Sequence, residues 1–159
     1  MKVNRFPFPE SVPVRISHPA GQFAHENFPQ TRYAVDFLLP VDTPVIAVKS
    51  GKVILVKQDS DNIHFNPADL EGKTLEEIMQ LAAEHTNLVA IDHGNGELTE
   101  YLHLRRDGAT VQVGQEVTEG DVIGYTGYTG IMTEPHLHYN AFNSKGESIP
   151  TEFPRQSEQ

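Results

Sequence analysis

The chain has 159 residues, 38% of them hydrophobic, which suits one domain with a packed core and is short for two. Its 22 acidic and 12 basic residues leave a net charge of −10, which argues against nucleic acid as a partner. The absence of cysteine excludes disulfides, thiolate zinc sites and cysteine nucleophiles. Any bound metal must therefore be held by His, Asp or Glu.

Neither end of the chain carries a strong structural signal. Four prolines before residue 20 predict an extended N-terminal arm over residues 1–20, with no apolar segment typical of a signal peptide. The protein is then cytoplasmic if Met1 is the native start, and its compartment stays open if an export signal was trimmed. No run approaches the roughly 18 apolar residues of a membrane span. Residues 144–159 are predicted to be a polar tail without a regular element, and nothing indicates an oligomeric state.

Between these ends the sequence predicts short strands separated by glycine turns. The predicted strands cover residues 33–40, 43–48, 51–56, 88–93, 98–104, 122–125 and 134–142. A tight turn joins the second and third of them, and Gly94-Asn95-Gly96 is a typical hairpin turn between the fourth and fifth. This pattern predicts one all-β domain of antiparallel sheets.

Residues 58–86 interrupt the β pattern. Apolar residues recur at helical spacing after Thr74, and Thr74 forms a capping box with Glu77. We therefore predict an insertion over residues 58–86 that carries one short amphipathic helix, around residues 69–85, and lies over one side of the β domain.

The last predicted strand contains a His-x-His motif. Because side chains alternate along a strand, His136 and His138 leave the same face, about 6 to 7 Å apart. The two imidazoles can share a metal, or one can bind it while the other acts on a metal-bound water. The alternative is a pair of exposed histidines in a hairpin.

Two other polar residues lie in apolar strands. Asp36 is either paired or metal-bound, since an unpaired buried carboxylate costs several kcal/mol, or it points into solvent beside a turn. In the strand 98–104, alternation places His103 on one face with Tyr101, opposite Leu102, where it can line a groove.

Taken in order, several fragments resemble the M23 family of zinc metallopeptidases, the lysostaphin/LytM-type endopeptidases. The fragments are Gly-x-Phe-x-His at 21–25, Tyr-Ala-Val-Asp-Phe at 33–37, Tyr-Leu-His-Leu at 101–104, the glycine-rich run 124–130 and Pro-His-Leu-His at 135–138. The resemblance implies a LytM-like fold of antiparallel sheets with a duplicated hybrid motif, and a metallopeptidase domain over residues 21–143.

By this resemblance, one zinc ion is held by His25, Asp36 and His138, with one position left open for water, as in catalytic zinc sites. His103 and His136 flank that position and share the acid–base and oxyanion roles. Many members carry the first ligand four residues before the Asp, where this chain has Arg32. The Gly-x-Phe-x-His context favours His25 over His18.

The resemblance implies a zinc-dependent endopeptidase that hydrolyses peptide bonds in peptidoglycan cross-bridges or stem peptides, in a family found mostly in the periplasm or outside the cell. One alternative is a non-catalytic LytM-like domain that only binds or regulates a partner, which turnover would distinguish. Another is a phosphoryl carrier built on the hybrid motif, which explains two histidines and leaves Asp36 without a role. Metal content separates that alternative from the peptidase.

Overall fold

The computed structural model describes residues 1–17, 31–61, 63–131 and 134–154. Its strands and helices are β1 (Arg15–Ser17), β2 (Val35–Leu38), β3 (Pro44–Ile46), β4 (Gly51–Lys57), β5 (His64–Phe65), the 3-10 helix η2 (Pro67–Leu70), α2 (Leu75–His85), β6 (Asn87–Asp92), β7 (Leu98–Leu104), β8 (Glu116–Val117), β9 (Val122–Tyr125), β10 (Gly130–Ile131), β11 (Leu137–Phe142) and β12 (Ser148–Ile149). No helix in this part of the chain is long and apolar enough to cross a membrane.

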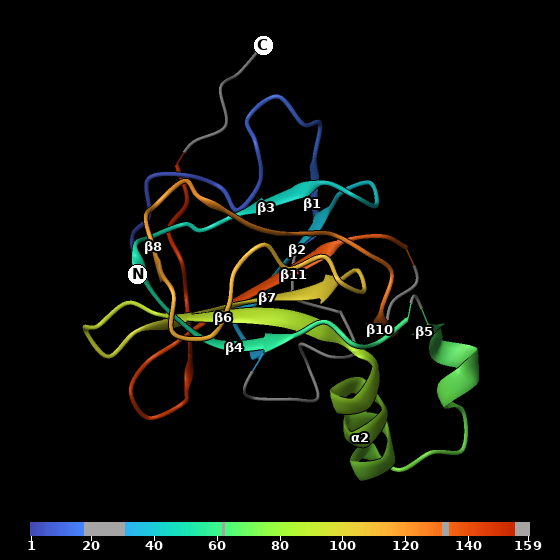
Figure 1. Cartoon of the computed structure of the whole chain (residues 1–159). Coiled ribbons are helices and arrows are strands. Elements are labelled where there is room, and N and C mark those ends of the chain that lie inside the picture. Colours follow the sequence, from blue (N-terminus) through green and yellow to red (C-terminus); the bar gives the residue numbers. More distant parts are fainter. Residues whose placement is uncertain (18–30, 62, 132–133, 155–159) are drawn as a thin grey trace.

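Most of these strands belong to one sheet (Figure 1). Within the described residues it has eight strands in the order β1-β2-β11-β7-β6-β4-β8, with β12 added to β11. The pairs β3–β9 and β10–β5 form two small sheets, and only β10–β5 is parallel. The predicted all-β fold of antiparallel sheets with one short helix is confirmed.

The glycine turn after β6 makes the expected hairpin, because Gly94 and Gly96 adopt φ values of +82° and +84° that favour glycine. The predicted tight turn between β3 and β4 does not form a hairpin, because these two strands do not pair with each other. Instead β3 pairs with β9, and β4 pairs with β6 and β8. Local patterning therefore located these two strands correctly, while their partners come from the second half of the chain.

The core lies on one face of the large sheet, where β3 and β9 cover it. Paired residues of neighbouring strands share a face, so Phe37 with Leu137, and Tyr139 with Tyr101, all turn inward. These four side chains are at most 1% exposed. The opposite face of the same strands is left to carry polar side chains.

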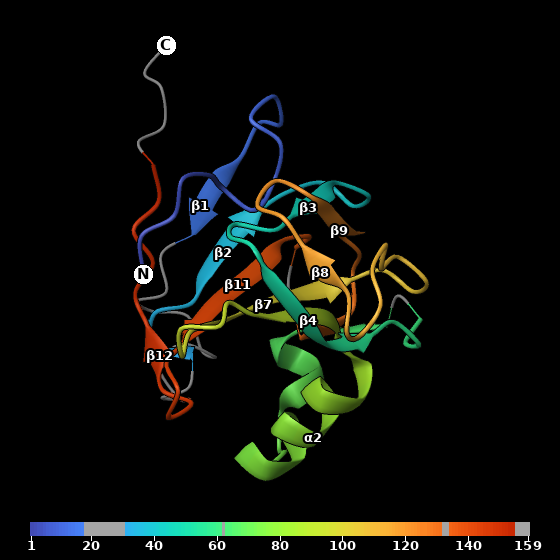
Figure 2. The same ribbon diagram turned by 60° about the vertical axis from the view of Figure 1, so that its left-hand side comes forward.

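Both terminal segments contribute to the core, and the C-terminal one corrects an expectation. In the N-terminal arm, Phe8 is 5% exposed and β1 pairs with β2. The segment expected to be a tail holds β12, and Phe153 stacks on Phe6 with ring centroids 5.3 Å apart. Figure 2 shows the N-terminal segment (blue) beside the last described segment of the chain (red), where Lys2 and Glu152 form a β-bridge. Aromatic burial between distant segments explains the difference.

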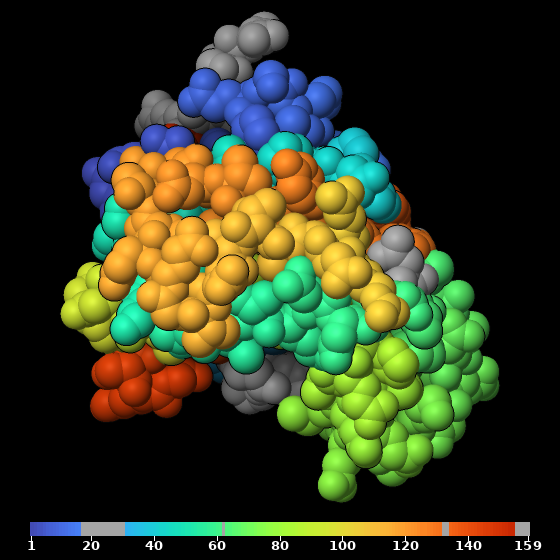
Figure 3. All heavy atoms as spheres, in the orientation of Figure 1, coloured from blue at the N-terminus to red at the C-terminus, as the bar shows by residue number. Residues whose placement is uncertain are grey.

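The insertion contains β5, η2 and α2 and forms a lobe on one side of the molecule, green at the lower right in Figure 3. Helix α2 begins after Thr74 as predicted. The Thr74 hydroxyl accepts a hydrogen bond from the Glu77 amide at 3.1 Å, and the Glu77 carboxylate accepts one from the Thr74 amide at 3.3 Å. Strand β5 ties the lobe to the domain by pairing with β10.

Candidate metal centre

Two strands bring the predicted ligands Asp36 and His138 together. Asp36 on β2 is paired directly with His138 on β11, so both side chains leave the face of the sheet that lies away from the core. Asp36 Oδ1 lies 3.0 Å from His138 Nδ1, and the two residues are 9% and 6% exposed. The alternative of a solvent-exposed Asp36 is therefore wrong.

His136 lies two residues before His138, immediately before the first residue of β11, and reaches the same cluster. Its Nε2 lies 3.6 Å from Asp36 Oδ1. Its Nδ1 lies 3.0 Å from the carbonyl oxygen of Glu134. Because a carbonyl oxygen can only accept a hydrogen bond, Nδ1 of His136 carries the proton and Nε2 is the nitrogen turned toward Asp36.

His103 reaches the cluster by a route that alternation does not predict. Tyr101 belongs to the core face, and Leu102 is paired with His138 on the opposite face. Between Leu102 and Leu104 the register of β7 against β6 shifts, so His103 is the extra residue of a β-bulge, and its φ is +74°. The prediction that His103 shares the face of Tyr101 is wrong, although the expectation that it lines the site holds.

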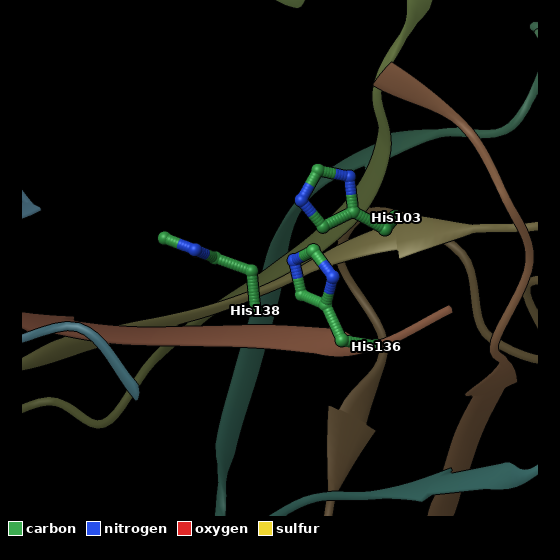
Figure 4. A group of neighbouring side chains, drawn as sticks. All are labelled: His103, His136 and His138. Atoms are coloured by element: carbon green, nitrogen blue, oxygen red, sulfur yellow. The ribbon is translucent and has the colours of Figure 1, made fainter. Parts of the chain in front are cut away.

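The positive φ at His103 is uncommon for a residue other than glycine and is often found at functional sites. It turns the imidazole toward the His-x-His motif, with ring centroids 4.6 Å from His136 and 5.9 Å from His138. Figure 4 shows the rings of His103 and His136 side by side, with His138 further along the strand. His103 Nδ1 donates to the carbonyl of Thr129 at 2.5 Å, which leaves the lone pair of the neutral ring on Nε2.

Burial and neighbouring charges shift the pKa values of His103 and His138 in opposite directions. Burial, followed by the proximity of His136 and His138, holds the pKa of His103 well below its ordinary value. For His138 burial acts in the same direction, but the hydrogen bond and charge of Asp36 raise its pKa overall. His103 is thus neutral at pH 7, while His138 forms a tightly coupled pair with a carboxylate.

Glu100 is a further acidic residue near the cluster, and sequence reasoning did not single it out. It is paired with Asn140 on the face that carries His138, and burial raises its pKa although the charge of His138 lowers it. The signal was available, since Glu100 is a charged residue in phase with Leu98 and Leu102 along the same strand.

The donor atoms fit a metal ion. One nitrogen from each of His103, His136 and His138 lies within 4.8 Å of the others, and Asp36 contacts two of these rings. Two ligands of one tetrahedral zinc lie about 3.4 Å apart, given bonds of about 2.0–2.2 Å, which is near the separation of Asp36 Oδ1 and His138 Nδ1. Imidazole and carboxylate donors suit zinc.

Four of the five predicted site residues are therefore neighbours, and the fifth, His25, lies outside the described residues, as does His18. The remaining histidines are engaged elsewhere. His64 packs on Tyr128, with ring centroids 3.8 Å apart, and His85 packs on Phe65 at 5.3 Å. His93 bonds to Ser50 and Thr99.

Comparison with known proteins shows the family to which the chain belongs. Residues 30–150 match the model of peptidase family M23. The chain belongs to peptidase family M23. It is 35% identical over 104 residues to the peptidoglycan DD-endopeptidase ShyA of Vibrio cholerae, a match that covers 65% of this chain and 18% of ShyA.

A second relative, the DD-carboxypeptidase/endopeptidase Mpg of Neisseria meningitidis, is 34% identical over 132 residues, covering 82% of this chain and 25% of Mpg. The chain thus spans a quarter or less of the length of either M23 relative. The crystal structure of the catalytic domain of lysostaphin from Staphylococcus simulans matches 86% of the chain and 88% of that domain, with a TM-score of 0.57 and 23% identity. This last likeness supports the LytM-like fold.

Proposed function

We propose that this M23 domain is a zinc-dependent endopeptidase that hydrolyses peptide bonds by an activated water. One observation carries the proposal: the Asp36 carboxylate and the His138 imidazole converge to 3.0 Å beside the paired rings of His103 and His136. A convergent, buried set of carboxylate and imidazole donors next to further ionisable groups is the arrangement that hydrolytic metal sites require.

Asp36 and His138 are the proposed zinc ligands, together with His25. A zinc ion held there supplies Lewis-acid polarisation of the scissile carbonyl and lowers the pKa of its bound water. The orientations of the rings support a division of the cluster into one zinc-binding histidine, His138, and two catalytic histidines, His103 and His136. His138 directs Nδ1 toward Asp36, whereas His103 and His136 each use Nδ1 on a backbone carbonyl.

His103 is the proposed general base. Its ring is neutral because burial holds its pKa low, and its Nδ1 is anchored on Thr129, so Nε2 can accept a proton. His136 is proposed to stabilise the developing oxyanion, since its anchored ring turns Nε2 toward the ligand cluster and donates from there when protonated.

The proposed substrate class is a peptide of peptidoglycan, either a cross-bridge or a stem peptide. Support comes from ShyA and Mpg, whose names describe endopeptidases, in the first case of peptidoglycan. Because the chain has a net charge of −10, long-range attraction to an anionic polymer is not expected, so recognition rests on short-range contacts beside the metal centre. Such a substrate places the active domain outside the cytoplasmic membrane.

The first test is metal content, measured by elemental analysis on protein purified without a histidine tag. We expect close to one zinc per chain, and its loss in Asp36→Ala. Asp59→Asn is the matched control, because Asp59 is an exposed carboxylate paired only with Lys57 in the described structure. No zinc, even after zinc is offered, would contradict the proposal and favour the carrier alternative.

The second test is turnover. Purified peptidoglycan is incubated with the zinc-loaded protein, and the released fragments are identified by mass spectrometry. New amino termini that depend on Asp36 support the endopeptidase. Stoichiometric zinc without cleavage of peptidoglycan or of a general peptide library would favour the regulatory LytM-like domain.

A further inference from the structure

The loop between β9 and β10 holds His103 from both sides. The amide of Gly127 donates to the carbonyl of His103 at 2.8 Å, and the ring Nδ1 of His103 donates to the carbonyl of Thr129 at 2.5 Å. These two bonds fix both the strained backbone of the bulge and the orientation of the imidazole. The position of the Thr129 carbonyl therefore decides where Nε2 of His103 lies.

The side chain of Thr129 fixes that carbonyl in turn. Its hydroxyl donates to the carbonyl of Leu104 at 2.9 Å and accepts a hydrogen bond from the amide of Asn87 at 3.3 Å. Thr129 is fully buried, so water cannot replace either partner. A residue without a hydroxyl here would lose both of these hydrogen bonds to the backbone of β6 and β7.

Asn87 connects Thr129 to the insertion. Its Oδ1 accepts from the amide of Ser60 at 3.0 Å, and its Nδ2 donates to the carbonyl of Ser60 at 2.8 Å. Ser60 lies near the beginning of the insertion and Asn87 directly follows its end. The two-point pairing of the Asn87 side-chain amide therefore closes the insertion at its base, and the backbone amide of the same residue holds the Thr129 hydroxyl.

The insertion also contacts the loop one residue further on. The amide of Gly130 donates to the carbonyl of Ile63 at 2.9 Å, where β10 pairs with β5. Gly130 has a φ of +94°, and a Cβ there would overlap the Thr86 hydroxyl and lie 3.2 Å from His103 Nδ1. Thr86 of the insertion and the ring of His103 therefore both lie against Gly130, which links the insertion to His103.

We propose that Thr129 and Asn87 are positioning residues, through which the insertion holds His103 in its Nδ1–H tautomer with Nε2 available to the substrate. Thr129 acts through its own carbonyl, and Asn87 acts through the Thr129 hydroxyl. The catalytic part of the inference rests on the proposed function. The structural part concerns the state of the His103 ring and holds whether or not the chain cleaves peptides.

The test of the structural part is nitrogen-detected NMR of the histidine rings in the full chain, with and without zinc. The His103 signals are assigned by their loss in His103→Asn. We expect a single Nδ1–H tautomer for His103 in the unmodified chain. Thr129→Val, which keeps the branched shape and removes both hydroxyl bonds, is expected to give a mixture of tautomers, and Thr129→Ser is expected to restore the single form.

The matched control is Thr110→Val. The hydroxyl of Thr110 also donates to a backbone carbonyl, that of Val122 at 2.8 Å, but Thr110 is exposed and makes no contact with the metal centre in the described structure. It is expected to leave the His103 signals unchanged. If Thr129→Val fails to fold, Asn87→Ala removes the side-chain pairing with Ser60 and so tests the link from the insertion, while both hydrogen bonds of the Thr129 hydroxyl stay in place.

In peptide hydrolysis, Thr129→Val is expected to lower kcat about 10–100-fold, with KM changed less than twofold and zinc content unchanged, because outer partners of catalytic groups have effects of that size. Thr129→Ser is expected to recover kcat to within about threefold. A single Nδ1–H tautomer retained in both Thr129→Val and Asn87→Ala, or a mixture already in the unmodified chain, would overturn the inference. Absence of hydrolysis in every variant, with the expected NMR result, would instead contradict the proposed function alone.

Discussion

Asp36 Oδ1 and His138 Nδ1 lie 3.0 Å apart, although 102 positions separate the two residues in the chain. The antiparallel pairing of β2 with β11 sets them opposite one another on the face of the sheet away from the core. This single pair explains why a carboxylate is tolerated between the apolar residues of β2. It also identifies which substitutions separate metal binding from catalysis.

Substitution of His138 should remove the metal. His138→Ala deletes one proposed ligand and leaves the buried carboxylate of Asp36 without its imidazole, so we expect zinc content to fall from about one per chain to less than about 0.1 in elemental analysis. His85→Ala is the control, since His85 lies at the end of α2, against Phe65. Retention of stoichiometric zinc in His138→Ala would show that the ligand set is wrong.

Substitution of His103 should impair catalysis and leave zinc binding intact. Asparagine tolerates the positive φ of His103 and can donate to the Thr129 carbonyl, but it lacks the Nε2 base. We expect His103→Asn to fold, to bind zinc normally and to lose about 10²–10⁴-fold in kcat, the usual contribution of general acid–base catalysis. Steady-state kinetics on zinc-loaded protein measures this, and full turnover in His103→Asn would refute the assignment of the base.

The unfolding free energy should depend on pH through His93, which is not one of the proposed site residues. Burial lowers the pKa of His93 below its ordinary value, outweighing the hydrogen bond to Ser50; Lys49 lowers it further, while Glu97 and Asp92 raise it. The His93 imidazole therefore binds a proton more readily in the unfolded chain than in the folded one. Its contribution to the free energy of unfolding is complete above about pH 6.5 and is lost as the pH falls below that value.

The measurement is denaturant unfolding of the unmodified chain and of His93→Gln at several values from pH 8 to pH 5. The stability advantage of the unmodified chain should shrink toward pH 5. Other groups, the metal centre included, are common to both proteins and cancel in the difference. An advantage that stays constant or grows toward low pH would contradict the predicted direction.

The C-terminal segment should matter for stability. Phe153 packs against Phe6, Phe37 and Tyr139, with ring centroids 5.3 to 5.4 Å apart. Because Phe153 is only partly buried, we expect Phe153→Ala to lower the unfolding free energy by about 2–3 kcal/mol, below the 3–5 kcal/mol of a fully buried phenylalanine. Tyr33→Ala, at a side chain that is 43% exposed, should change it by less than about 1 kcal/mol. Chemical denaturation compares the two.

The features that sequence reasoning predicted correctly depend on local patterns. Alternation located most strands, the Thr74–Glu77 capping box located the start of α2, and glycines placed the hairpin between β6 and β7. The His-x-His spacing placed His136 and His138 together, because alternation along a single strand holds over two residues whatever the strand pairs with. These signals are carried by neighbours in sequence, so they are visible without the fold.

The features that only the tertiary structure decided depend on contacts between distant segments. The bulge that turns His103 into the site arises from the register of β7 against β6, and the bonds of its ring and backbone go to the loop before β10. The pairing of β3 with β9 and the burial of Phe153 likewise need partners from the other end of the chain. Periodicity within one segment carries no information about such partners, and the same pattern is compatible with several pairings. The sequence by itself thus identified Asp36, His136 and His138 as candidates that the structure brings together, and long-range packing decided how His103 is oriented beside them.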